Sequence, residues 1–266
     1  MSQFENEHLT VFQSVLYQTT SAVIKTKQAL IVTDPNWLPN EIAEIKTYIE
    51  SIIEDRKLYL IYTHSDYDHI IAAGAFPHAT TIASEAFVKR ANKEEVLEQI
   101  RQFDAQYYID RDYSIIYPHI DIVIKEDGQT VELPDISCSF YFSPGHTADG
   151  LFTVVESFGI FLAGDYLSDV EFPFIEDYEA YLATIQKAQK IISDKKVEVI
   201  VPGHGTTTNN RSEIQKRIDA SLLYLNNLSS GNVDESELQK LYPFYKGLKE
   251  MHELNKKIFN KNSHRI

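Results

Sequence analysis

Short apolar runs separated by turns dominate the first third of the chain. Three of them are rich in β-branched residues and are expected to form consecutive strands: residues 11–17, 21–25 and 29–33. A helix is expected to open at Pro39-Asn40, because isoleucines follow at helical spacing between Ile42 and Ile53. Residues 58–62 (Leu-Tyr-Leu-Ile-Tyr) form an almost continuous apolar run, which is typical of a strand buried on both faces.

Residues 85–120 interrupt this pattern. They are strongly charged to about residue 101 and then carry four tyrosines, which predicts a helix followed by an irregular, aromatic-rich segment. Strands are then expected again, at residues 121–124, 130–133, 136–142, 151–155 and 159–163. A helix at 178–193 and a buried strand at 197–201 complete this part of the chain.

The segment 211–266 is expected to form a helical C-terminal extension. Ser212-x-x-Gln215 is a capping-box pattern, apolar residues follow at helical spacing, and Gly231 stands beyond the end of the helix. A last, basic helix is expected at 243–261. No repeat, low-complexity stretch or long linker interrupts the chain, so we expect residues 1–266 to form a single domain.

Composition limits the classes of function. With 43% apolar and 12% aromatic residues, the chain can bury a sizeable core, and its net charge of −14 disfavours nucleic-acid binding. The lone Cys138 excludes an intramolecular disulfide framework and fits a reducing compartment. The N-terminus lacks a signal-peptide pattern, and no apolar stretch approaches the roughly 20 residues needed to cross a bilayer. We expect a cytoplasmic protein without membrane or nucleic-acid partners; oligomeric state is not predicted.

Five loops, each directly after an expected strand, carry residues able to bind or support a metal ion. They hold Asp34, the motif His64-Ser65-Asp66-Tyr67-Asp68-His69, His146, Asp165 and His204. Sites in open α/β sheets form where loops converge at the carboxyl ends of strands. Four of the nine histidines fall in three of these loops, and imidazole and carboxylate are preferred ligands of zinc, iron and manganese.

The spacing within the first motif suits this chemistry. Residues 64, 66 and 68 alternate along an extended loop and can point the same way, while His69 can turn back from the next helix. Glycines beside His146, Asp165 and His204 allow tight turns, so that distant loops can meet. A metal-dependent hydrolase keeps one coordination position open for water.

Together these five motifs resemble the metallo-β-lactamase superfamily over Asp34 to His204. The resemblance implies an α+β fold, a four-layered αβ/βα sandwich with the metals at one edge of two facing sheets. Residues 85–120 lie between the first histidine motif and the strand leading to His146, so we expect them to cover the site as a lid-like helical insert. It implies that His64, residue 66 and His146 hold one metal, that Asp68, His69 and His204 hold the other, and that Asp165 bridges them. Asp34 would orient the histidine loop without touching a metal.

Position 66 departs from the family pattern, which usually has His where this chain has Asp. A carboxylate is a competent ligand, so Asp66 is expected to bind metal. The alternative is a single metal held by Asp68, His69, Asp165 and His204. Flavodiiron proteins of the same superfamily also have a carboxylate at this position, so a di-iron redox role is a weaker alternative.

We therefore expect a hydrolase with two divalent metal ions, zinc first and iron or manganese as alternatives. The Pro-Gly-His motifs resemble the glyoxalase II and lactonase branch, which implies a small ester, thioester or lactone substrate. Asp68 is expected to orient the nucleophile and pass a proton, and Tyr166 to reach a substrate carbonyl oxygen unless it is only a packed core residue. Tyr107 and Tyr108 are expected to line the substrate pocket, unless this aromatic-rich segment simply packs against the sheet. The alternative class is a metal-binding ligand sensor with little turnover.

Overall fold

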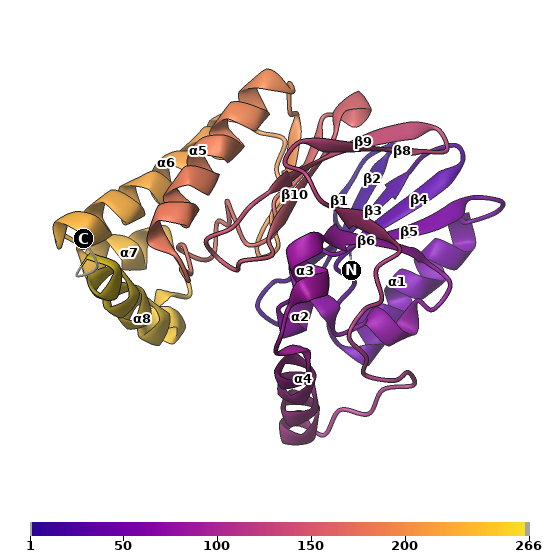
Figure 1. Cartoon of the computed structure of the whole chain (residues 1–266), viewed down its shortest axis with the longest axis horizontal. Helices are drawn as coiled ribbons and strands as arrows, with labels where there is room; N and C mark the ends of the chain where they lie inside the picture. The colour runs from indigo at the N-terminus through magenta and orange to yellow at the C-terminus, as the bar shows by residue number, and fades with distance from the viewer. Residues whose placement is uncertain (1, 264–266) are drawn as a thin grey trace.

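The computed structural model of the chain describes residues 2–263, with side chains to residue 260. Two sheets face each other (Figure 1). The larger sheet has seven strands in sequence order: β1 (Ser2–Glu5), β2 (Leu9–Gln13), β3 (Thr20–Lys25), β4 (Ala29–Thr33), β5 (Lys57–Ile61), β6 (Thr80–Ser84) and β7 (Ile122–Ile124). Pairing is antiparallel from β1 to β4 and parallel from β4 to β7.

The second sheet has five strands in the order β12-β11-β10-β9-β8. Their bounds are β8 (Gln129–Leu133), β9 (Ile136–Phe142), β10 (Leu151–Val155), β11 (Ile160–Leu162) and β12 (Val199–Val201). Only β11 and β12 pair in parallel. The β9, β10 and β11 strands therefore form a meander, and the connection from β11 to β12 crosses through a helix.

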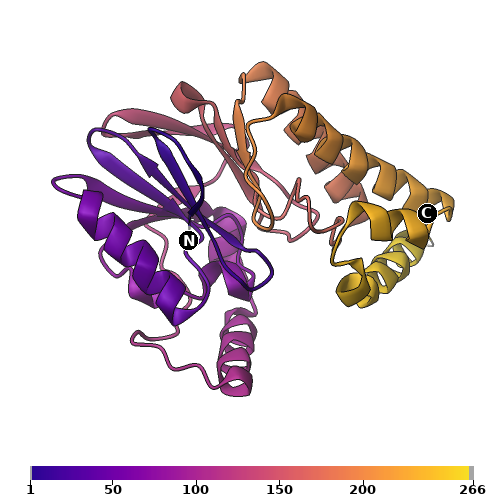
Figure 2. The ribbon, with the colours of Figure 1, turned by 180° about the vertical axis from the view of Figure 1, so that it is seen from behind.

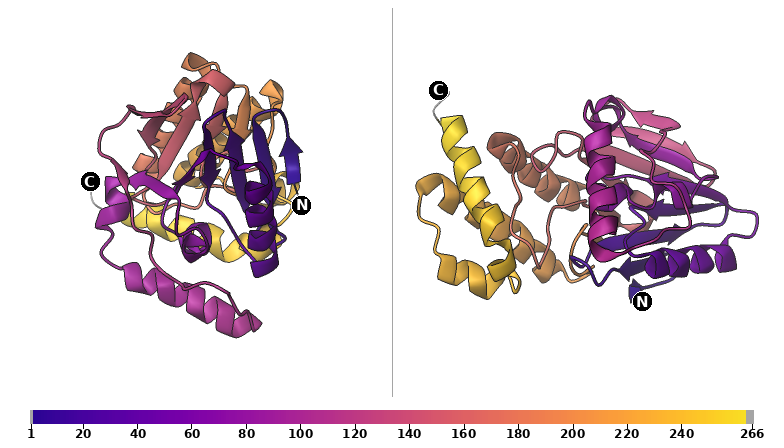
Figure 3. Two further views of the ribbon diagram at one scale, coloured as in Figure 1. Left: turned by 90° about the vertical axis from the view of Figure 1, so that its right-hand side faces the viewer. Right: turned by 90° about the horizontal axis from the view of Figure 1, so that it is seen from below.

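Helices cover the outer face of each sheet. The N-terminal group is α1 (Pro39–Ile52), α2 (Tyr67–Ile70), α3 (Glu85–Lys89) and α4 (Lys93–Tyr107). The C-terminal group is α5 (Tyr178–Asp194), α6 (Arg211–Ser230), α7 (Glu235–Leu241) and α8 (Tyr245–Ser263). Figure 2 shows α1 along the outer face of the larger sheet, and Figure 3 shows the C-terminal helices on the opposite side of the molecule. The expected α+β, four-layered sandwich is confirmed.

Alternation along the strands explains why the apolar runs are nearly continuous. In β4, Leu30 and Val32 pack toward the N-terminal helices, whereas Ala29 and Ile31 pack between the two sheets. Successive side chains of a strand point to opposite faces, so a strand covered on both sides needs apolar residues throughout. The middle of the sandwich contains the side chain of Cys138, which is fully buried.

Several local predictions were wrong. The expected strand at residues 11–17 ends at Gln13, because a turn follows in which Tyr17 and Gln18 have left-handed backbone angles (φ 51°). Strands β1 and β6 and helix α7 were not expected. The predicted capping box at Ser212 is also wrong: Asn210 is the N-cap, and its side chain accepts hydrogen bonds from the backbone N–H groups of Ser212 and Glu213.

Other local features agree with the predictions from the sequence. Residues 85–107 form α3 and α4, and residues 108–121 contain no helix or strand. Gly231 ends α6 in the left-handed conformation (φ 71°). Among the residues that the structure describes, no helix is both long and apolar enough to cross a membrane. The role of residues 85–120 as a lid, and the single-domain interpretation of residues 1–266, stay predictions.

Candidate metal centre

The five loops meet at one edge of the sandwich. Asp34 follows β4, the His64 motif follows β5, His146 follows β9, Asp165 follows β11 and His204 follows β12. The β4–β5 pair and the β11–β12 pair are each parallel, so the carboxyl ends of the strands within each pair lie at the same edge. A hydrogen bond from the Gly203 N–H to the carbonyl of Gly164 (2.6 Å) joins the Asp165 and His204 loops directly.

The four histidines present one ring nitrogen to a common point and use the other for support. The supporting Nδ1 atoms each meet an oxygen: Thr63 Oγ1 for His64 (3.1 Å), Asp34 Oδ2 for His69 (2.9 Å), the Phe174 carbonyl for His146 (3.0 Å) and the Tyr17 carbonyl for His204 (2.9 Å). The Nε2 atoms of His64, His69 and His146 are buried and have no hydrogen-bond partner. Buried donors or acceptors without partners are costly, so their convergence fits a bound cation.

Asp165 lies between these nitrogens. Its Oδ2 is 3.1 Å from His146 Nε2, 3.3 Å from His204 Nε2 and 3.6 Å from His64 Nε2. Its Oδ1 is 3.1 Å from His69 Nε2. One carboxylate therefore contacts all four histidines and can be shared by two metal ions.

Two groups of donors lie on either side of Asp165. His64, Asp66 and His146 form one group, and Asp68, His69 and His204 form the other; within each, one ligand atom per residue lies within 4.8 Å of the others. Asp66 Oδ2 is 3.4 Å from His146 Nε2 and 3.7 Å from His64 Nε2. The structure thus brings together all seven residues predicted as ligands, in the two sets that the resemblance implied, and places Asp66 beside His64 and His146.

Asp34 supports both sets from behind. Its Oδ2 accepts hydrogen bonds from His69 Nδ1 (2.9 Å) and Thr63 Oγ1 (2.5 Å), and its Oδ1 accepts one from the Thr63 N–H (2.9 Å). Thr63 Oγ1 also meets Nδ1 of His64. The carboxylate is buried, and it fixes the rings of two histidines as well as the loop between them.

Burial and the nearby carboxylates together shift the pKa values of the four histidines. Burial alone would lower the pKa of His69, His146 and His204, but the neighbouring carboxylates raise it well above the usual value. Burial also lowers the pKa of His64, with the charge on His69 adding to the effect. Metals bind unprotonated imidazole, so metal uptake by this cluster should release protons.

Asp66 is an ionised carboxylate in this setting. Burial would raise its pKa, but the nearby imidazoles of His146 and His64 hold the pKa below its usual range. Its Oδ1 is 3.5 Å from Nη1 of Arg90, which also donates to the backbone carbonyl (3.1 Å) and the hydroxyl (2.6 Å) of Ser65. Ser65 in turn donates a short hydrogen bond to Asp149 in the loop of His146.

Arg90 and Glu171 were not identified from the sequence. Arg90 lies in a charged stretch at the end of α3, where nothing distinguishes it from exposed basic residues. Glu171 lies in an irregular segment, and its Oε1 is 3.9 Å from Nδ1 of His204. Burial raises the pKa of the Glu171 carboxyl. Only the folding of the chain places these two charges beside the cluster.

Tyr166 does not lie where it could contact a substrate. It is 2% exposed, and its hydroxyl accepts a hydrogen bond from the His146 N–H (3.0 Å) and lies 2.9 Å from the Pro144 carbonyl, to which it donates. This hydroxyl therefore holds the backbone of the His146 loop, and the alternative of a packed core tyrosine describes it better than a contact with substrate.

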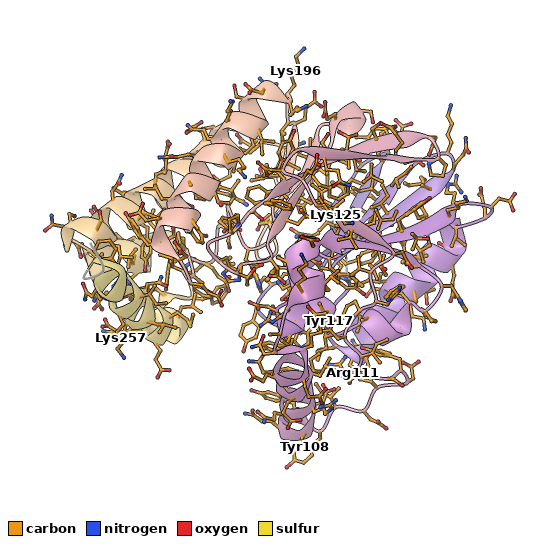
Figure 4. All side chains as sticks on the ribbon, viewed as in Figure 1. Tyr108, Arg111, Tyr117, Lys125, Lys196 and Lys257 are labelled. Atoms are coloured by element: carbon orange, nitrogen blue, oxygen red, sulfur yellow. The ribbon has the colours of Figure 1, made fainter. Side chains whose placement is uncertain are left out.

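Tyr107 and Tyr108 are at the far end of α4, which extends away from the sheets (Figure 3). Tyr108 is 96% exposed, and Figure 4 labels it at this tip. The ring of Tyr107 contacts Phe103 (4.8 Å), whose ring lies 6.4 Å from that of Tyr67 in the metal-binding motif. The structure thus links Tyr107 to the site through a row of rings and does not bring Tyr108 to it.

The fold and the donor set define a sandwich protein with a candidate dinuclear metal centre. A family model described as the metallo-beta-lactamase superfamily matches residues 15–204, which is most of the chain and includes all seven donors. This chain belongs to the metallo-beta-lactamase superfamily.

Solved structures share this fold at low sequence identity. A metallo-beta-lactamase from Pontibacter korlensis matches with a TM-score of 0.59 and 17% identity over 85% of this chain and 99% of that one. The stereoselective inverting sec-alkylsulfatase Pisa1 from Pseudomonas sp. matches with a TM-score of 0.68 and 13% identity, over 85% of this chain and 42% of the other. Rubredoxin oxygen:oxidoreductase from Desulfovibrio gigas matches with a TM-score of 0.58 and 14% identity, over 85% of this chain and 62% of the other. At these identities the likeness shows the fold alone.

Proposed function

We propose that this protein is a metal-dependent hydrolase of small esters, thioesters or lactones. The observation that carries the proposal is the arrangement of seven donors in two groups around Asp165. Four imidazoles with three carboxylates suit zinc first, with iron or manganese as alternatives. Two bound divalent cations supply Lewis acidity and lower the pKa of a water molecule, which is the chemistry that hydrolysis requires.

The residues of the chain have separate tasks in this proposal. Asp165 and the histidine Nε2 atoms would hold the two cations, while Asp34 and Tyr166 keep the ligand loops in place. Asp68 is the candidate for proton transfer. Its Oδ2 lies 3.5 Å from His69 Nε2 and 3.4 Å from His204 Nε2, so its carboxylate faces the cluster and could take the proton of the attacking water and pass it to the leaving group.

The substrate class rests on further observations. The net charge of −14 disfavours a polyanionic substrate such as a long nucleic acid, so a small molecule is favoured. The row of rings formed by Tyr67, Phe103 and Tyr107 offers an apolar surface next to the metal-binding motif. The alkylsulfatase among the structural neighbours makes a sulfate ester a useful member of any substrate panel.

A panel of small substrates tests the proposal. The purified protein, loaded with zinc or with manganese, is assayed against a p-nitrophenyl ester, a thioester, a lactone, a phosphodiester and a sulfate ester. We expect turnover of at least one carboxylic ester, thioester or lactone, with loss on chelation and recovery on metal addition. His204→Ala should lose most activity and retain less metal, because the Asp68 group loses a neutral donor.

Two results would argue for other functions. Tight metal binding without turnover of any substrate would favour a ligand sensor. Iron as the metal retained on purification, with oxygen reduction and no hydrolysis, would favour the di-iron redox role that the carboxylate at position 66 suggests. Protein that binds no metal after reconstitution would contradict all three.

A further inference from the structure

A buried polar network in the C-terminal helices reaches the segment beside His146. Asn255 of α8 is 0% exposed, and its side chain makes three hydrogen bonds. Its Nδ2 donates to the carbonyl of Pro173 (2.6 Å) and to the hydroxyl of Tyr224 (2.8 Å), and its Oδ1 accepts from the N–H of Ile175 (3.1 Å). An asparagine amide offers a donor and an acceptor side by side, which is what these two backbone groups require.

The residue between these two backbone groups is Phe174, whose carbonyl oxygen accepts the hydrogen bond from His146 Nδ1 (3.0 Å). Asn255 therefore holds the chain on both sides of the carbonyl that orients the His146 ring. The direction of a carbonyl group is set by its peptide plane, and this plane joins Phe174 to the clamped Ile175.

The side chains around Asn255 are themselves held in place. The Tyr224 hydroxyl of α6 lies 2.9 Å from Nδ1 of His252, and both side chains are buried. Phe172 stacks on the ring of Tyr224 (5.2 Å, 26°) and also meets His252. The segment that supports His146 is thus fixed from α6 and α8 together, in a dry environment where lost hydrogen bonds are costly.

We propose that Asn255 is a positioning residue for His146, so that helix α8 forms part of the support of the metal centre. The effect should be confined to one donor group. The Nδ1 atoms of the other histidines are held by Thr63, Asp34 and Tyr17, none of which belongs to this network. Asn255 therefore acts on the group of His64, Asp66 and His146 and not on the group of Asp68, His69 and His204. This inference rests on the metal centre of the proposed function but not on the reaction.

The test compares Asn255→Ala with Leu238→Ala. Leu238 is buried in the same helical layer, on α7, so its truncation should also destabilise the protein, but its apolar side chain makes none of the hydrogen bonds that hold residues 173–175. Zinc affinities are measured by competition with a chromophoric chelator in full-length protein. Asn255→Ala should weaken the binding of one zinc ion by about tenfold, the lower end of the effect of losing a direct partner of a ligand, because Asn255 acts on His146 through Phe174. The second zinc ion, and both ions in Leu238→Ala, should keep their affinity.

A measurement on the metal-free protein tests the orientation of His146 independently of zinc binding. In metal-free wild-type protein, NMR should show slow exchange of the His146 Nδ1 proton with solvent, because this proton is hydrogen-bonded to the Phe174 carbonyl. In Asn255→Ala this proton should exchange faster. The exchange rate of the His69 Nδ1 proton should be the same in both proteins. If Asn255→Ala folds poorly, Tyr224→Phe takes its place. This variant removes one hydrogen bond from Asn255 and should speed exchange at His146 to a smaller extent. Unchanged exchange at His146, or equal weakening of both zinc ions in Asn255→Ala and Leu238→Ala, would overturn the proposal. Wild-type protein that binds no zinc yet has a protected His146 proton would instead count against the proposed function.

Discussion

Asp34 accepts more hydrogen bonds from the metal-binding loops than any one ligand does, which makes Asp34→Asn an informative perturbation. The substitution keeps the shape of the side chain and removes its charge. One oxygen becomes an NH₂ group, which cannot accept. Placed at Oδ2, that group faces His69 Nδ1 and Thr63 Oγ1; placed at Oδ1, it faces the Thr63 N–H. In either orientation at least one buried donor loses its acceptor.

The magnitude follows from these contacts. Leaving a buried donor unsatisfied costs about 1–3 kcal/mol. Part of this cost appears as lower stability, and part as weaker metal binding, because the His69 ring, and His64 through Thr63, lose their fixed orientation. Since about 1.4 kcal/mol corresponds to a factor of ten, we expect zinc to bind roughly 10–100-fold more weakly, as is usual when a residue that orients a ligand is replaced.

The assay is zinc affinity by chelator competition, with thermal unfolding of the metal-free protein measured in parallel. Ser21→Ala is the matched control, because the Ser21 hydroxyl bonds the backbone of Asp34 and Asn36 in the same buried loop but no histidine. We expect the control to lose stability and keep its zinc. If Asp34→Asn bound both zinc ions as tightly as wild type, the proposed support of the histidines by Asp34 would be refuted.

Three further predictions concern other parts of the chain. Asp66→His should shift metal preference toward zinc and away from manganese, because imidazole replaces an oxygen ligand; identical metal preference in both forms would support the one-metal alternative. Tyr107→Ala should raise KM for an apolar ester more than Tyr108→Ala does, since only Tyr107 is joined to the metal-binding motif by ring contacts, and equal KM values would remove the ring row from substrate binding. Burial raises the pKa of the Cys138 thiol to about 12, so its reactive thiolate is scarce at pH 8. A thiol reagent should therefore modify Cys138 only after denaturant is added, and rapid modification of native protein would contradict its burial.

The sequence determined the candidate donors through local patterns, and the fold class through the resemblance to the metallo-β-lactamase superfamily that these donors carry. Continuous apolar runs such as residues 58–62 indicate strands covered on both faces, and polar residues directly after such strands must lie at the sheet edge where the strands end. His64, Asp165 and His204 were found in this way. The same local signals failed where a competing one was stronger: the apolar run at 11–17 is cut short by a turn after Gln13, and Asn210 caps α6 ahead of Ser212.

Only the tertiary structure decided how the donors are supported. The turn at residues 14–18 brings the Tyr17 carbonyl to His204, although no motif marks that carbonyl. Tyr166 holds a backbone N–H at His146, and Asn255 reaches the neighbouring segment from the last helix. Hydrogen bonds to backbone groups place almost no demand on residue type, and their partners lie far apart in the chain. Their geometry exists only once the helices have packed on the sheets, which is why the sequence predicted the ligands and not the contacts that orient them.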